Sequence, residues 1–297
     1  MLRVGLIGIG IMGAAYGTNL LEAGFEVSGF DLDEDRREVL RTAGGSPVAS
    51  ASEVAANSDV ILIALPSTGA LTDAIQGKGG VLEGAHPGLI CVEMSTFPLD
   101  AKVRARDVLA EAGVQMLDAP VSGTGLQAAA AEVVVYASGE QEALDRARAV
   151  FQALGKETFE LGEFGNGSRM KYVANLLVSV NNLATAEAFV LGMKGGLAPD
   201  QILEVISAGV GSSRIFEIRG PMMAEDDYEP SAKLRMFIKD ISVIGEFGEQ
   251  IGAPTPLLDA SLPFYEEAVA AGLGDLDGAA LCRLLETKAA FERTPLS

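Results

Sequence analysis

Residues 2–31 constrain the fold more than any other part of this sequence. A short apolar run at 2–7 leads directly into glycines spaced as G-x-G-x-x-G, then into a helical pattern and an apolar run at 25–30. Such glycines permit a tight turn and let backbone N–H groups approach a pyrophosphate at the N-terminus of the helix. The context predicts a dinucleotide site, the alternative being a glycine-rich turn that serves packing alone. The expected cofactor contacts are Gly8, Gly10, Ile11, Met12, Gly13 and, at the end of the second run, Asp31.

The alternation of strands and helices continues after this unit. Apolar runs at 58–65, 88–93 and 114–118 predict buried parallel strands, with helices at 68–76 and 98–112. Ligands of open α/β sheets gather at the carboxyl ends of the strands. We therefore expect a ligand to be faced by residues that end these runs or follow them, namely Leu65, Pro66, Ser95, Thr96, Ser122 and Gly123. Of these, Leu65, Pro66 and Thr96 are expected cofactor contacts. Two more strands are predicted at 133–138 and 157–160, with a helix at 141–153 between them.

The segment Ser122-Gly123-Thr124, which follows the run at 114–118, consists of small residues. Small residues of this kind suit a nest of backbone N–H donors for a carboxylate, but taken alone they favour an ordinary turn.

A long helix is predicted from the glycine-rich loop at 162–167 to Lys194-Gly195-Gly196, with Asn166 or Ser168 as the N-cap residue. It is apolar nearly all round, so we expect it to be buried on most sides, although its polar residues argue against a membrane span. Lys171 and Asn175 share one face, because they are four residues apart. Spacing alone leaves Lys171 either as a functional group or as a lysine that reaches the surface from the first turn.

The length of 297 residues predicts two domains. We expect an α/β Rossmann-type domain at 1–162 and an all-α domain at 163–297, joined by the long central helix. Helical periodicity recurs at about 199–207, 233–251, 256–271 and 277–288.

Composition excludes several classes of function. A net charge of −19 argues against binding to nucleic acid or to an anionic membrane. With one histidine, His86, and two cysteines, Cys91 and Cys282, the chain shows no metal-ligand pattern, and no nucleophile elbow accompanies the histidine. Two separated cysteines and no signal-peptide pattern predict a cytoplasmic protein with reduced thiols.

Taken together, the motifs resemble those of the β-hydroxyacid dehydrogenases, which include 3-hydroxyisobutyrate dehydrogenase, tartronate semialdehyde reductase and relatives of 6-phosphogluconate dehydrogenase. The resemblance covers residues 2–290 approximately. It rests on Gly8-Ile-Gly10-Ile-Met12-Gly13 with Asn19-Leu20, on Asp118-Ala-Pro-Val-Ser122-Gly123, on Gly162-x-x-Gly165-x-Gly167-x-x-x-Lys171-x-x-x-Asn175, and on Lys239-Asp240.

The resemblance implies roles for individual residues. Lys171 is implied as the general acid/base, Asn175 and Ser122 as substrate-binding residues, and Lys239 as a neighbour of the cofactor. Gly123 and Thr124 belong to the substrate loop, but Thr124 replaces a glycine that the family usually has. This departure and the alanine-rich segment 126–131 leave the identity of the substrate open.

The leading hypothesis is an NAD-dependent dehydrogenase of a small 3-hydroxy acid, with the substrate between the domains near Lys171. Hydride transfer from an alcohol needs a proton acceptor, and no Tyr-x-x-x-Lys pair is present to supply one. An imine reductase on the same fold is the alternative enzyme, but such relatives usually lack the lysine. A non-catalytic NAD-binding or chromatin-associated module is the alternative from another class.

Two further expectations concern the cofactor and the assembly. Asp31 favours NAD over NADP, because a carboxylate disfavours a 2′-phosphate; Arg36 and Arg37 are the counter-argument. The apolar helical domain predicts a homodimer or homotetramer.

Overall fold

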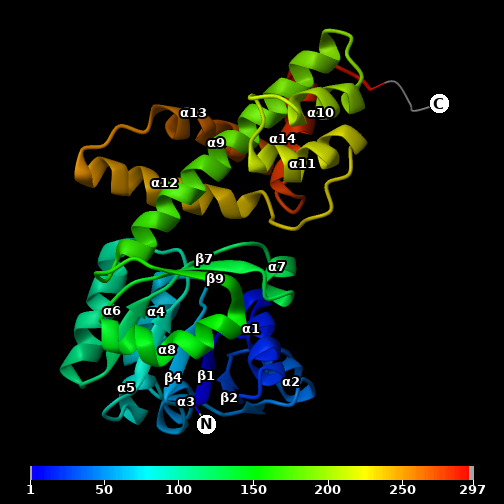
Figure 1. Ribbon diagram of the computed structural model, residues 1–297. Helices are drawn as coiled ribbons and strands as arrows, with labels where there is room; N and C mark the ends of the chain where they lie inside the picture. The colour runs from blue at the N-terminus through cyan, green and yellow to red at the C-terminus, as the bar shows by residue number, and fades with distance from the viewer. Residues whose placement is uncertain (1, 294–297) are drawn as a thin grey trace. The chain divides into compact units, whose positions relative to one another are not determined.

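The computed structural model describes residues 2–293, and it divides into two compact units (Figure 1). The first unit extends to Lys171 and the second begins at Tyr172. The division therefore lies inside helix α9 (Asn166–Lys194). The expected domain limits of 1–162 and 163–297 place it in the loop before this helix. The helix is one continuous element that belongs to both units.

The first unit is built on a parallel sheet of six strands. The strands in spatial order are β3 (Ser46–Pro47), β2 (Glu26–Phe30), β1 (Arg3–Ile7), β4 (Val60–Ile63), β5 (Ile90–Glu93) and β6 (Gln115–Asp118). This is the doubly wound order of a dinucleotide-binding domain, so the expected Rossmann-type fold is confirmed. Every residue of β4 and β5 is buried, because helices cover both faces of the sheet.

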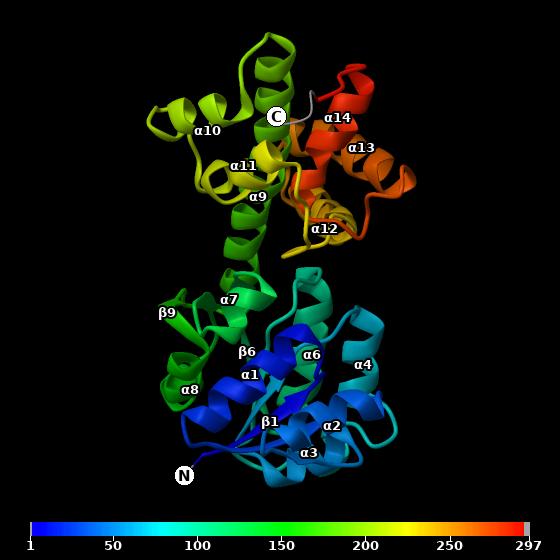
Figure 2. The same ribbon diagram turned by 90° about the vertical axis from the view of Figure 1, so that its right-hand side faces the viewer.

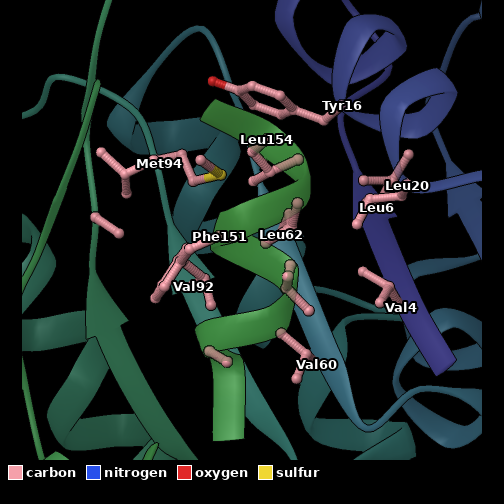
Figure 3. Close-up of a cluster of buried hydrophobic side chains, with 14 of the residues drawn as sticks. Val4, Leu6, Tyr16, Leu20, Val60, Leu62, Val92, Met94, Phe151 and Leu154 are labelled. Carbon is pink, nitrogen blue, oxygen red and sulfur yellow. The ribbon is translucent and has the colours of Figure 1, made fainter. Parts of the chain in front are cut away.

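The helices of the first unit pack on opposite faces of this sheet (Figure 2). One face is covered by α1 (Ile11–Glu22) and α8 (Gln141–Leu154), and the other by α3 (Ala51–Asn57), α4 (Thr68–Gln76) and α6 (Leu99–Glu111). On the first face, Tyr16 and Leu20 of α1 and Phe151 and Leu154 of α8 meet the inward side chains of β1 and β4 (Figure 3). Two further helices, α2 (Glu34–Thr42) and α5 (Val81–Gly84), complete this part.

A small second sheet follows the sixth strand. It contains β7 (Val121–Ser122), β8 (Val133–Ala137) and β9 (Gly155–Glu160), with β7 antiparallel and β9 parallel to β8. The sequence predicted a plain loop where the structure has β7 and the short helix α7 (Gly125–Ala129). The two-residue strand is too short to give a periodic signal, so only its pairing with β8 reveals it. A bridge between Asp118 and Ser138 connects the two sheets.

The described residues of the second unit are helical, as expected. After α9 come α10 (Pro199–Ser207), α11 (Arg214–Glu225), α12 (Arg235–Ile251), α13 (Pro256–Ala270), a 3₁₀ turn η1 (Gly278–Ala280) and α14 (Leu281–Lys288). The sequence did not predict α11, because Gly220-Pro221 interrupts its pattern; the structure keeps Pro221 inside the helix. The core contains the stacked pairs Phe189–Phe216 and Phe237–Tyr265.

Helix α9 is less enclosed than its composition suggested. Leu183, Ala186 and Phe189 are buried, but Val173, Leu177 and Leu191 are 58%, 54% and 79% exposed. The expectation of burial on most sides is therefore wrong for one side of the helix. The helix is long and apolar enough to cross a membrane by length and composition, a test that buried core helices also pass.

Candidate active site

The glycine-rich turn after β1 has the geometry that its spacing predicted. Gly8 has a φ of +90°, and a Cβ built on it would lie 2.3 Å from the carbonyl oxygen of Ala64. A Cβ on Gly13 would lie 2.0 Å from the carbonyl oxygen of Gly8. The first glycine therefore makes the turn, and the third lets α1 pack directly on the end of the strand.

The N-terminus of α1 is open to a ligand. Gly10 is its N-cap residue and provides no side-chain hydrogen bond to the first turn. A Cβ on Gly10 would meet only Arg36 within 4 Å, and the next residue, Ile11, is 79% exposed, while Met12 packs against the core. N–H groups of a first helical turn have no helical partner and attract phosphate. The turn therefore fits the pyrophosphate of a dinucleotide.

Asp31 is fixed at the end of β2, where the adenosine ribose of a dinucleotide is expected. Its Oδ2 accepts a hydrogen bond from the Ile9 N–H at 2.7 Å, and its Oδ1 accepts one from the Asp33 N–H at 3.0 Å. Arg36 Nη1 lies 4.0 Å from Asp31 Oδ2, and Arg36 Nε lies 3.6 Å from Asp33 Oδ2, so Arg36 is paired with acidic side chains of the same turn. Arg37 donates to the carbonyl oxygen of Asp31 and pairs with Glu34.

The loops after β4 and β5 are connected to each other. The Leu65 N–H donates to Ser95 Oγ at 3.0 Å, and the Ser95 N–H donates to Glu93 Oε1 at 2.9 Å. Pro66 is exposed and Thr96 is half-buried beside this contact. The two loops therefore form one edge of the site, at the carboxyl ends of their strands.

The predicted substrate loop is only partly as expected. Ser122 belongs to β7 and lies opposite Val134, and Gly123 has a φ of +149°. Thr124 begins α7 with a capping box, in which its own N–H donates to Gln127 Oε1 at 2.9 Å. Because this N–H is already bonded, the expected nest of donors is left with at most the N–H groups of Ser122 and Gly123.

The first turn of α9 rests on β6. The Ser168 N–H donates to Asp118 Oδ2 at 2.7 Å and the Ser168 hydroxyl to Asp118 Oδ1 at 2.8 Å. Neither Asn166 nor Ser168 caps the helix with its side chain, so the predicted N-cap residues are wrong. Both lie inside the helix. The Asn166 N–H donates to the carbonyl oxygen of Glu163, and the next two N–H groups donate to the side chains of Ser138 and Asp118.

Lys171 lies on α9 one turn before Asn175, on the same face of the helix. In the second unit, Asn175 Nδ2 donates to Asp240 Oδ2 at 2.8 Å, and Lys239 Nζ lies 3.7 Å from Asp240 Oδ1. Sequence reasoning noted the Lys239-Asp240 pair but gave Asp240 no role; its bond to Asn175 is the contact that was missed.

Residues 3–162 match the family described as the NAD binding domain of 6-phosphogluconate dehydrogenase, and residues 165–285 match that described as NAD-binding of NADP-dependent 3-hydroxyisobutyrate dehydrogenase. The L-threonate dehydrogenase of Cupriavidus necator is 33% identical over 283 residues, which are 95% of this chain and 95% of that protein. The chain belongs to the β-hydroxyacid dehydrogenase family. It is therefore an oxidoreductase with an NAD-binding domain.

Other members of the β-hydroxyacid dehydrogenase family are similarly related. The NAD-dependent L-serine dehydrogenase of Pseudomonas aeruginosa is 30% identical, over 96% of this chain and 98% of that protein. The structure of Mycobacterium tuberculosis 3-hydroxyisobutyrate dehydrogenase with L-serine has a TM-score of 0.87 and 29% identity, over 96% of this chain and 99% of that one. The imine reductase of Bacillus cereus, at 18% identity and a TM-score of 0.63, shares the fold alone.

Two other titratable groups of this β-hydroxyacid dehydrogenase, His86 and Tyr16, are poorly placed for proton transfer. His86 Nε2 lies 2.9 Å from the carbonyl oxygen of Ser58, which precedes β4 and so marks the amino edge of the sheet, opposite the ligand loops. Tyr16 is buried, and burial raises the pKa of its hydroxyl well above the usual range. Among residues 2–293, no three His, Cys, Asp or Glu side chains are grouped to hold a metal ion.

Proposed function

We propose that this protein is an NAD-dependent dehydrogenase of a small 3-hydroxy acid, similar to 3-hydroxyisobutyrate, with Lys171 as the general acid/base. The observation that carries the proposal is the fixed start of α9. Ser168 is bonded twice to Asp118 of the sheet, and Lys171 follows three residues later on the same rigid helix. These bonds support the role of Lys171, because they hold the helix turn that carries it against β6 of the sheet.

The residues of the chain divide the chemistry as follows. When bound, NAD supplies the hydride acceptor. Lys171 in its neutral form accepts the proton of the substrate hydroxyl during oxidation, and its ammonium returns a proton during reduction. Asn175 donates its Nδ2 to Asp240, so its Oδ1 is left to accept a hydrogen bond from that hydroxyl. The N–H groups of Ser122 and Gly123 bind the substrate carboxylate.

The relatives support the substrate class without fixing the substrate. Their names include an L-threonate dehydrogenase, a 2-(hydroxymethyl)glutarate dehydrogenase and a glyoxylate/succinic semialdehyde reductase. Each name denotes a small acid that carries a hydroxyl or an aldehyde. A site with a lysine and a carboxylate-binding loop suits that common chemistry.

The proposal is tested with the Lys171→Ala variant and a panel of small hydroxy acids, by following the absorbance of NADH. Loss of a positioned general acid/base lowers turnover by about 10²–10⁴-fold. We expect that loss, with NADH binding, measured by fluorescence, unchanged. Near-normal turnover of Lys171→Ala on the preferred acid would exclude this role for the lysine.

We also propose that the chain forms a homodimer or homotetramer in a reducing, cytoplasmic compartment. The exposed apolar side chains of α9, Val173, Leu177 and Leu191, support a contact with a second copy, because apolar stripes of this kind seldom face water. Cys91 and Cys282 are both free and buried, as reduced thiols would be. Light scattering of the protein and of Leu177→Glu tests the assembly: a monomeric wild-type protein at micromolar concentration would contradict it.

A further inference from the structure

Three ionisable side chains are fully buried beneath the ligand loops of the first unit. Lys102 of α6 is 0% exposed, and its Nζ lies 2.6 Å from Glu93 Oε2 and 2.8 Å from Asp118 Oδ1. It also donates to the carbonyl oxygen of Ser95 at 2.6 Å. Glu93 and Asp118 are likewise 0% exposed, at the ends of β5 and β6. We call Glu93, Lys102 and Asp118 the buried charge cluster.

Stability alone is a weak explanation for such a cluster. Removing ions from water is costly, and well-packed apolar side chains often replace a buried ion pair without loss of stability. Burial raises the pKa of Glu93, against the effect of Lys102 and Ser95. Burial lowers the pKa of Lys102, but Asp118 and Glu93 outweigh it and raise that pKa above its ordinary value, so the ammonium stays charged. A charged group held at this cost suggests a role in geometry.

The cluster provides the hydrogen-bond acceptors for the start of α9. Asp118 accepts bonds from the N–H and the hydroxyl of Ser168. The Gly167 N–H donates to Ser138 Oγ at 2.9 Å, and the Ser138 hydroxyl donates to the carbonyl oxygen of Asp118 at 3.1 Å. These N–H groups belong to the first turn, where no helical carbonyl oxygen can accept them, and the helix dipole favours a carboxylate there.

The first turn has no room to move towards the sheet. A Cβ built on Gly167 would lie 2.2 Å from the carbonyl oxygen of Tyr136 and 2.7 Å from that of Asp118. Lys102 also binds the loop of Ser95, whose hydroxyl accepts the Leu65 N–H. One buried group of charges thus fixes both the start of α9 and the loop edge at the carboxyl ends of the strands.

We propose that Asp118, held in place by Lys102, is a positioning residue for Lys171. The buried charge cluster sets the height and rotation of the first turn of α9, and thereby the point from which the Lys171 ammonium reaches the substrate. This inference rests on the proposed role of Lys171 as the general acid/base. Misplacement by about 1 Å is enough to cost about 10²-fold in rate, so fixing the helix has a direct effect on turnover.

Two serines provide a matched test. Ser168 and Ser261 are each 1% exposed and each donates one hydroxyl bond, at 2.8 Å to Asp118 and at 2.7 Å to the carbonyl oxygen of Leu258. We expect Ser168→Ala and Ser261→Ala to lower the melting temperature by similar amounts. Only Ser168→Ala should lower kcat, by about five- to tenfold, a fraction of the loss that full misplacement gives. NADH binding should stay within twofold of the wild-type value in both.

The Asp118→Asn variant extends the series. It keeps the size of the side chain but removes the carboxylate, so we expect kcat to fall by about 10²-fold while NADH still binds. The serine pair keeps the test decisive if Asp118→Asn does not fold. Equal kcat in the two serine variants, or a loss of kcat that follows the loss of melting temperature in both, would overturn the positioning role.

Lys171→Ala, assayed beside these variants, distinguishes a failure of the positioning role from a failure of the proposed function. If it loses turnover while Ser168→Ala keeps it, the positioning role fails and the proposed function stands. If Lys171→Ala keeps its turnover, both fail.

Discussion

Helices α1 and α9 begin after similar turns, but the N–H groups of their first turns have different hydrogen-bond partners. Each follows a glycine-rich turn in the first unit. At α1 the N-cap residue is Gly10, and no side chain among the described residues caps the first turn. At α9 the side chains of Asp118, in β6, and Ser138, just after β8, accept hydrogen bonds from the N–H groups of Ser168 and Gly167.

The same property of a helix N-terminus can therefore serve two different functions. A helix N-terminus carries unsatisfied N–H groups and a partial positive charge. An N-terminus without a side-chain cap, as at α1, suits the phosphates of a cofactor. Closed by a buried carboxylate, as at α9, it fixes the helix and with it the position of Lys171.

The largest expected effect comes from removing Lys102, the cation that holds Asp118 at the start of α9. Lys102→Met leaves Glu93 and Asp118 buried without their cation, and loss of one partner of a buried pair costs about 3–5 kcal/mol. We expect a loss of that size in the free energy of unfolding, measured with urea. The control is Arg3→Met, which removes the exposed pair with Asp59 and should have a much smaller effect. Equal losses in the two variants would contradict the comparison.

Two glycines distinguish the functions of the two helix starts. Gly13→Ala places a methyl group against the carbonyl oxygen of Gly8, and Gly167→Ala places one against that of Tyr136. Each crowded site should cost about 1–3 kcal/mol of stability. Beyond that shared cost, Gly13→Ala should raise the Kd for NADH, whereas Gly167→Ala should lower kcat and leave NADH binding intact. The same change in both variants, either a raised Kd for NADH or a lowered kcat alone, would contradict the different functions of the two helix starts.

The smallest effect concerns cofactor choice at the open start. We expect kcat/KM to favour NAD over NADP by roughly tenfold, which corresponds to about 1.4 kcal/mol, because Asp31 lies where a 2′-phosphate would be. Asp31→Asn keeps one acceptor oxygen, replaces the other with an amide donor and removes the charge, so it should narrow the ratio of kcat/KM with NAD to kcat/KM with NADP. Steady-state kinetics with both cofactors decide this, and a wild-type preference for NADP would remove the role given to Asp31.

Much of the first unit follows from local patterns. The spacing of Gly8, Gly10 and Gly13 predicted the turn, because each glycine answers a local steric requirement of the backbone. The long apolar runs predicted β4, β5 and β6, because strands buried on both faces have no polar side. Neither argument could find α11, whose Gly220-Pro221 interrupts the helical period while the surrounding core keeps the helix continuous.

The site was predictable to the extent that its residues lie close together in sequence. Lys171 and Asn175 share a helix face, and Asp31 ends a strand, so their places could be inferred from spacing. The bond between Asn175 and Asp240 joins residues 65 positions apart, and no local pattern reports it. The capping box of Thr124 and Gln127 follows a local sequence pattern and could have been predicted, although Thr124 was interpreted only as the replacement of a family glycine.

The sequence by itself therefore determined the Rossmann-type fold, the open start of α1 and a lysine on a long helix, because backbone sterics and hydrophobic periodicity act over a few residues. Only the tertiary structure decided what holds that lysine in place. Glu93, Lys102 and Asp118 lie on three different elements, and each alone reads as an ordinary charged residue of a strand end or a helix. Folding removes all three from water, and their charges are then satisfied by one another, by the loop at Ser95 and by the first turn of α9.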